Sequence, residues 1–291
     1  MDTRAHRQGA QPPMPVGHPS RLLVAGDTHG DWRWVRTLAR QAARHAADAI
    51  VVLGDFGYWE HERDGVTFLD VVDYHLAQQN LELFFVDGNH DNHPLLWQRY
   101  PPQPPHGFAL LRTRIRYAPR GHRWRWHGVD FLALGGAPSI DRAWREQYAR
   151  DRGVAIWWPT EQLTDAQAQQ AAAGPADVML CHDAPDGAEP DGLKDDADSW
   201  LHRRRLADVV DAVAPRQLWH GHYHERGTRW RRTADGRHTI VESLADNSNG
   251  GPDSWMLVDL PVLARELARL PAFVHPLADQ PARRQETPDD R

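Results

Sequence analysis

Short apolar runs alternate with longer amphipathic segments along the first third of the chain. The runs at 22–25, 50–53 and 83–86 are almost wholly apolar, which is typical of parallel strands covered on both faces. The segments at 32–46 and 66–80 place apolar residues at helical spacing. This βαβαβ order predicts parallel strands joined by right-handed crossovers.

The remainder of the chain predicts a second group of strands and helices. After a short helix at 93–100 and a Pro-rich break, strands at 115–117, 123–126 and 129–134 look antiparallel, and 135–162 reads as a long loop rich in Arg and Trp. The further elements are helices at 164–173 and 199–213 and strands at 178–181, 217–219, 228–232, 238–242 and 255–259. We therefore expect an α/β fold with two mixed sheets and helices outside them, a four-layer α/β/β/α sandwich.

Length and composition place one domain between two polar ends. The chain has 291 residues, of which 41% are apolar, and its 13 Trp supply large side chains for a core. Residues 1–20 resemble a disordered leader and 276–291 a charged, disordered tail, so we assign the domain to 21–275.

Charge and cysteine content restrict the function classes. A net charge of −6 disfavours a surface for duplex nucleic acid, which is usually basic. Cys181, the single cysteine, cannot form an internal disulfide, which fits a reducing compartment. The sequence has no apolar run of membrane-spanning length and no signal-peptide core, so we expect no membrane association and a cytoplasmic protein. The oligomeric state is not indicated.

Polar motifs stand at the ends of predicted strands and carry the candidate chemistry. They are Asp27-Thr28-His29, Gly54-Asp55, Gly88-Asn89-His90-Asp91, His182 and Gly221-His222-Tyr223-His224. Nitrogen and oxygen ligands without thiolate suit Mn²⁺, Fe, Zn²⁺ or Ni²⁺. The strand ends can bring these residues together, so we expect two divalent metal ions, with Mn²⁺ favoured.

Each motif suits a different part of such a site. Asp27 and His29 are two residues apart, so in extended backbone both can reach one ion. Asp55 can bridge two ions because each carboxylate oxygen can take one. Asn89 can ligate through its carbonyl oxygen without adding charge.

The histidine-containing motifs supply further ligands and a residue for the substrate. His222 and His224 can each bind a different ion of a pair, and His182 follows a strand directly. His90 can face the substrate, and Asp91 could accept a hydrogen bond from its ring and raise its basicity.

Taken in order, these motifs resemble those of the calcineurin-like metallophosphoesterase superfamily, which read D-x-H, G-D, G-N-H-(D/E), a lone H and G-H-x-H. The resemblance spans Asp27 to His224. It implies an α/β/β/α sandwich, a first metal held by Asp27, His29, Asp55 and His224, and a second held by Asp55, Asn89, His182 and His222. It also implies that His90 lies beside the leaving group and is oriented by Asp91.

One departure from this pattern concerns the residues after the bridging carboxylate. Protein phosphatases of the superfamily continue G-D-x-x-D-R-G, whereas this chain reads Gly54-Asp55-Phe56-Gly57-Tyr58-Trp59. The missing Arg argues against a protein phosphatase. The stretch 135–142, together with Trp157-Trp158-Pro159, is similar to bacterial and phage phosphoesterases of unassigned substrate.

The expected reaction is metal-dependent hydrolysis of a phosphomonoester or phosphodiester, through in-line attack by a hydroxide held between the metals. His90 would stabilise or protonate the leaving oxygen. Arg142, Arg145, Trp157 and Trp158 could bind a nucleotide, although we favour solvated arginines and packed tryptophans for these positions. A nuclease or cyclic-nucleotide phosphodiesterase with the same metals is an alternative. A second alternative is a non-catalytic scaffold on the same fold. Such a scaffold is expected to lose metal ligands, and none is missing from this sequence.

Overall fold

Two mixed sheets of six strands each form the centre of the molecule. The computed structural model describes residues 17–58, 63–104, 106–193, 196–233, 236–248 and 250–269. Most of the predicted leader and the whole predicted tail lie outside these residues. Within the described parts of the chain, every helix is too short or too polar to cross a lipid bilayer.

Sheet A is built mainly from the first half of the chain. Its strand order is β12-β1-β2-β3-β5-β4, in which β1, β2, β3 and β5 are parallel and the two edge strands are antiparallel to their neighbours. The bounds are β1 (Arg21–Ala25), β2 (Ala49–Leu53), β3 (Glu82–Val86), β4 (Ala109–Arg112), β5 (Ile115–Tyr117) and β12 (Trp255–Asp259).

Sheet B repeats this arrangement with the second half of the chain. Its order is β10-β11-β9-β8-β7-β6, with four parallel central strands and an antiparallel strand at each edge. The bounds are β6 (Arg123–Trp126), β7 (Val129–Leu134), β8 (Val178–Cys181), β9 (Gln217–His220), β10 (Gly227–Arg232) and β11 (His238–Ser243).

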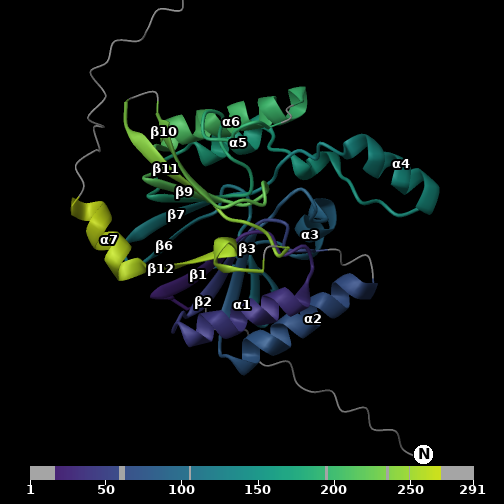
Figure 1. The fold of residues 1–291 in the computed structure, drawn as a ribbon, viewed down its shortest axis with the longest axis horizontal. Coiled ribbons are helices and arrows are strands. Elements are labelled where there is room, and N and C mark those ends of the chain that lie inside the picture. The colour runs from purple at the N-terminus through teal and green to yellow at the C-terminus, as the bar shows by residue number, and fades with distance from the viewer. Residues whose placement is uncertain are drawn as a thin grey trace, which may run out of the picture.

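Helices cover the outer faces of the two sheets, which confirms the predicted four-layer sandwich (Figure 1). Three separate apolar clusters fill the spaces between the layers. The middle cluster joins the sheets through side chains such as Phe84, Phe131 and Trp219. The helices are α1 (Trp32–Arg44), α2 (Arg63–Gln78), α3 (His93–Arg99), α4 (Arg142–Arg152), α5 (Asp165–Ala171), α6 (Ala197–Val213) and α7 (Leu260–Arg269).

Local sequence explains where several helices begin. Asp31 caps α1 by accepting hydrogen bonds from the backbone N–H groups of Arg33 and Trp34 at 2.9 and 3.3 Å. Thr164 and Gln167 form a reciprocal capping box at the start of α5. These caps set the helix starts close to the predicted positions.

The observed local structure differs from the prediction in three ways. The predicted loop 135–162 contains α4 and a short 3-10 helix, Pro159–Glu161. Only Arg145 is buried on α4, so this helix lacks the apolar periodicity that predicts helices. The strand β4 and the helix α7 were not predicted. The strand β5 belongs to sheet A and runs parallel to β3, so the antiparallel expectation holds only for β6 and β7 among the three.

Candidate metal centre

The carboxyl ends of parallel strands from both sheets meet at one edge of the sandwich. Asp27 follows β1, Asp55 follows β2 and Asn89 follows β3, all from sheet A. His182 follows β8 and His222 follows β9, from sheet B. Parallel strands point their carboxyl ends the same way, which is why motifs far apart in sequence converge here.

Close backbone approach explains two glycines of the motifs. A Cβ atom at Gly88 would overlap the Asp55 carboxylate, and one at Gly221 would overlap that of Asp27. A glycine at each position therefore lets a carboxylate from another strand lie directly against the backbone.

Among the described residues, three groups of potential ligands lie close enough to share ions. In each group one ligand atom per residue lies within 4.8 Å of the others. The groups are Asp27, His29 and His224; His29, Asp55 and His90; and Asp27, Asp55 and His182. Asp27, His29 and Asp55 each belong to two of these groups, and Asp55 is the carboxylate that we predicted to bridge two ions.

Asn89 and His222 lie at the same place by other contacts. The Oδ1 atom of Asn89 is 3.1 Å from Nε2 of His182. The ring of His222 is 4.9 Å from that of His182, and its backbone N–H donates to Asp27 Oδ1 at 3.0 Å. The structure therefore brings together all seven side chains that we predicted as ligands.

Three of the histidines turn the same ring nitrogen toward the carboxylates. His182 donates from Nδ1 to the carbonyl oxygen of Leu53 at 2.8 Å, and its Nε2 lies 3.4 Å from Asp55. His29 has its Nδ1 2.9 Å from Oδ1 of Asn247, with Nε2 facing Asp55 at 3.5 Å. An outer acceptor that holds one ring nitrogen and leaves the other free is the usual arrangement around metal-ligating histidine.

His224 follows the same pattern through an acid that the sequence did not reveal. Its Nδ1 is 3.4 Å from Asp246, and its Nε2 is 3.2 Å from Asp27. Asp246 and Asn247 follow β11 and belong to no recognisable motif. Only the fold shows that they orient two of the histidines.

The buried carboxylates attract positive charge. Burial by itself opposes ionisation, yet His182 and His90 hold the pKa of Asp55 well below its usual range. Burial likewise lowers the pKa of His182, but Asp55 and Asp27 outweigh it and raise that pKa to about 10. Burial also lowers the pKa of His29, whereas its hydrogen bond to Asp55 helps raise it to about 9. A divalent cation would supply this charge directly.

One incompletely bonded atom supports the same fit. Oδ2 of Asp27 is buried, and although Nε2 of His224 lies 3.2 Å from it, the geometry is not that of a well-formed hydrogen bond. A buried carboxylate oxygen without a well-formed hydrogen bond is costly unless a cation satisfies it. The oxygen and nitrogen donors present therefore fit divalent metal ions.

The carboxylate of Asp91 has different partners from the one that we predicted. Its Oδ1 accepts from the backbone N–H groups of Gly57 and Tyr58 at 3.0 and 2.9 Å, and its Oδ2 accepts from Gly88 at 2.9 Å. Asp91 therefore ties together the loops that carry Asp55 and His90.

The ring of His90 lies instead against Arg145 of α4, with NH2 of the guanidinium 2.6 Å from Nε2. The expectation that Arg145 is solvated was wrong, because it is only 5% exposed. Arg142 is exposed, as expected, and its guanidinium lies over the Trp157 ring.

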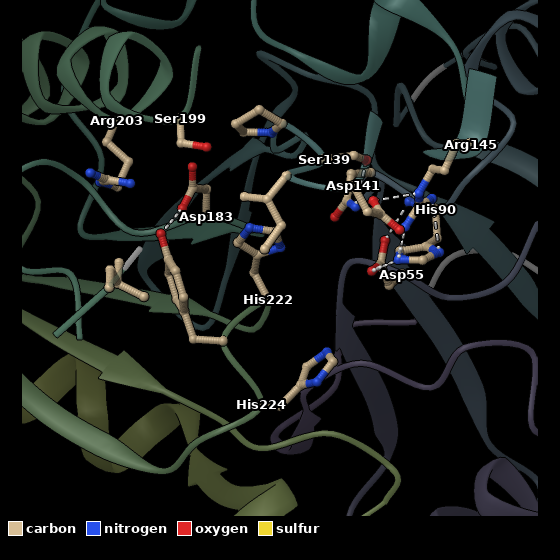
Figure 2. A pocket seen from close by; sticks show the side chains of 15 residues that line it. Asp55, His90, Ser139, Asp141, Arg145, Asp183, Ser199, Arg203, His222 and His224 are labelled. Atoms are coloured by element: carbon tan, nitrogen blue, oxygen red, sulfur yellow. Dashed lines mark hydrogen bonds and ion pairs between the residues drawn. The ribbon is translucent and has the colours of Figure 1, made fainter. Parts of the chain in front are cut away.

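A pocket of about 500 Å³ opens beside these residues. Figure 2 shows Asp55, His90 and Arg145 on one side of it and Asp183, Ser199 and Arg203 on the other, with His222 between them. Tyr223 donates to the buried Asp183 at 2.5 Å and so links the motifs of His182 and His222.

Comparison with solved structures gives similar folds at low identity. A dimetal phosphatase from Danio rerio is 15% identical, with 81% of this chain and 91% of that chain covered and a TM-score of 0.48. The protein TT1561 of Thermus thermophilus is 15% identical, with 84% and 95% covered and a TM-score of 0.45. No curated protein sequence matches the chain.

The sequence itself matches one protein family over most of its length. Residues 20–226, which include every motif of the centre, match the calcineurin-like phosphoesterases. The mixed sandwich and the clustered Asp and His side chains agree with this match. The chain therefore belongs to the calcineurin-like phosphoesterase family of metal-dependent phosphoester hydrolases.

Proposed function

We propose that this protein hydrolyses a small phosphoester, a monoester or a diester, by in-line displacement at phosphorus with two divalent metal ions. The observation that carries this proposal is the convergence of seven oxygen and nitrogen donors beside one pocket, with three histidines each held at Nδ1 by an outer acceptor. Two bound metals would activate a water molecule and neutralise charge on the phosphoryl oxygens.

The residues divide into two sets that share Asp55. Asp27, His29, Asp55 and His224 would hold one metal, since Asp27 and His29 lie within reach of His224 and Asp55. Asp55, Asn89, His182 and His222 would hold the other. Asp55 has its Oδ1 bound by the backbone N–H of His90 at 2.7 Å, which fixes the orientation of the shared carboxylate. Mn²⁺ is the metal that we favour.

His90 is our candidate for the leaving group. Its Nε2 lies 3.8 Å from Asp55, and the residue lines the pocket. From this position the ring would stabilise or protonate the leaving oxygen. Asp91 would act indirectly, by holding the loop of His90 through its three backbone hydrogen bonds.

The size of the pocket suits a small substrate such as a nucleotide. Its volume of about 500 Å³ lies within the range of sites for small molecules. Arg142 of α4 reaches to 3.7 Å from Asp198 in the first turn of α6, so the two helices approach each other.

The test uses purified protein with Mn²⁺ on p-nitrophenyl phosphate and bis-p-nitrophenyl phosphate in parallel. We expect metal-dependent turnover of at least one ester, and their ratio separates a monoesterase from a diesterase. An Asp55→Asn variant prepared in the same way excludes a contaminating phosphatase. Absence of turnover together with absence of bound metal would favour the non-catalytic scaffold.

A further inference from the structure

We infer that Arg145 is a substrate-binding residue that takes an unesterified phosphoryl oxygen, and that the preferred substrate is therefore a phosphomonoester. This inference rests on the proposed function and deepens it. Arg145 belongs to none of the metal-binding motifs. It lies on α4, the helix that the sequence pattern did not predict.

The Arg145 side chain is buried, which is unusual for an arginine. Arg145 is the one buried residue of α4, all of which the structure describes, although the helix extends away from the body of the molecule (Figure 1). Its guanidinium points into the pocket beside His90 and Asp55 (Figure 2). Burial of a guanidinium is costly unless a partner compensates its charge.

The guanidinium of Arg145 is anchored mainly through Nε, and its NH1 and NH2 groups face the His90 ring beside the pocket. Nε donates to Asp141 at 2.7 Å, and NH1 lies 3.4 Å from the carbonyl oxygen of Ile156. The remaining contacts are to the ring of His90, where NH1 and NH2 lie 3.2 and 2.6 Å from Nδ1 and Nε2.

The His90 ring is a poor hydrogen-bond acceptor for the NH1 and NH2 groups of Arg145. A neutral imidazole has one acceptor nitrogen, and a protonated one has none. Asp141, the carboxylate that pairs with Arg145, is 44% exposed and bonds to the Nε edge. Among the described residues, the NH1 and NH2 groups beside His90 therefore lack an anionic partner, and phosphoryl oxygens match the planar guanidinium fork.

The number of free oxygens decides the substrate class. A phosphomonoester has three unesterified oxygens and a phosphodiester has two. The third unesterified oxygen and the second negative charge of the monoester give the Arg145 guanidinium a further acceptor and a stronger attraction. Arg145 would then favour monoesters over diesters, and it would bind inorganic phosphate, the product of monoester hydrolysis.

The test compares Arg145→Met and Arg145→Lys with the wild type, all loaded with Mn²⁺. Calorimetric titration with inorganic phosphate needs no turnover, and kcat/KM is measured on p-nitrophenyl phosphate and on bis-p-nitrophenyl phosphate. We expect the phosphate Kd of Arg145→Met to rise about 10- to 100-fold, as for loss of a hydrogen bond between charged groups. Monoester kcat/KM should fall by a similar factor and diester kcat/KM by less. Arg145→Lys should recover part of the loss.

Arg150→Ala serves as the matched control, because Arg150 lies on the same helix, is exposed and bonds to Gln147. It should behave as wild type, and metal content should stay unchanged in every variant. The inference is overturned if Arg145→Met, or Arg145→Lys should the Met variant not fold, binds phosphate as tightly as wild type does. It is also overturned if the wild type binds no phosphate, or if both esters lose activity equally. Failure of the proposed function looks different, since the wild type would then hydrolyse neither ester, while phosphate titration would still test Arg145.

Discussion

Several of the candidate ligands hold a backbone conformation that is unfavourable for their residue types. His29, Asp55, His222 and His224 have φ values of 46°, 44°, 70° and 56°, in the left-handed region that favours glycine. Each such residue costs on the order of 1–3 kcal/mol, and surrounding structure must offset that cost. Half of the eight described non-glycine residues with positive φ are candidate ligands. At these positions the fold therefore places the candidate ligand side chains at a cost in stability.

The first prediction concerns His90. Replacing it with Ala should reduce kcat by about 10²–10⁴-fold, the usual contribution of a general acid or base, while the metal content stays the same. Steady-state kinetics and elemental analysis of the same preparation check both parts. An unchanged kcat would remove His90 from the mechanism.

The second prediction concerns Asp55, the carboxylate shared by both predicted metal sets. Asp55→Asn should lose bound metal and activity together, because the neutral amide cannot compensate two cations. Asp208→Asn, at an exposed position of α6, is the control and should retain both. Metal analysis after dialysis would contradict the ligand assignment if Asp55→Asn kept two ions per chain.

At the scale of elements, a buried ion-pair network holds the end of β3 in place. Asp87, which follows β3, accepts hydrogen bonds from Arg120 at 2.8 and 2.6 Å and from the Tyr117 hydroxyl at 2.9 Å. Arg120 also donates to the carbonyl oxygens of Glu161 and Gln162. The network therefore fastens the loop of Asn89 and His90 to the end of β5 and to the segment after α4.

The third prediction is that Arg120→Met destabilises the fold by about 3–5 kcal/mol, because Asp87 would remain buried without its cation. Arg125→Met is the matched control. Arg125 pairs with Asp130 on the surface, where its side chain is 65% exposed, and loss of an exposed pair costs less than about 1 kcal/mol. Urea denaturation measures both variants. Equal effects would show that the network around Asp87 contributes no more than a surface pair.

At the scale of the whole molecule, folding lowers the pKa of some histidines by removing them from water. Burial lowers the pKa of His93 to about 4, against the ordinary value of 6.5. Burial, with His106 nearby, lowers that of His122 to about 4 as well. His122 lies between Phe108 and Trp124 in an aromatic group. Between about pH 4 and 6.5, His93 and His122 therefore bind more protons in the unfolded chain than in the folded chain.

The fourth prediction follows from the sign of that difference. The free energy of unfolding should fall as the pH drops from about 6.5 to 4, since the unfolded state takes up more protons in this window. His122→Phe should make the fall shallower, because it removes one such group and keeps the aromatic packing. Denaturation at several pH values in the presence of a chelator checks this, and identical slopes for the two proteins would contradict it.

Much of the architecture and the core of the site follow from the amino-acid sequence alone. Continuous apolar runs such as 50–53 and 83–86 predict buried parallel strands because no polar side chain interrupts them. The motifs at the strand ends identified all seven candidate ligands for a related reason. Parallel strands carry their carboxyl ends to one edge of a sheet, so order along the chain indicates proximity in space.

The partners that support these side chains, and the residues beside them, could not be predicted before the fold was known. The helix α4 was not predicted because it packs almost no apolar surface. The position of Arg145 on this helix could therefore not be predicted either. Asp246 and Asn247 orient two histidines, yet they stand in a loop without a motif. The partners of Asp91 proved to be backbone N–H groups of Gly57, Tyr58 and Gly88. Such contacts depend on how the chain folds in three dimensions, and local pattern carries no information about them.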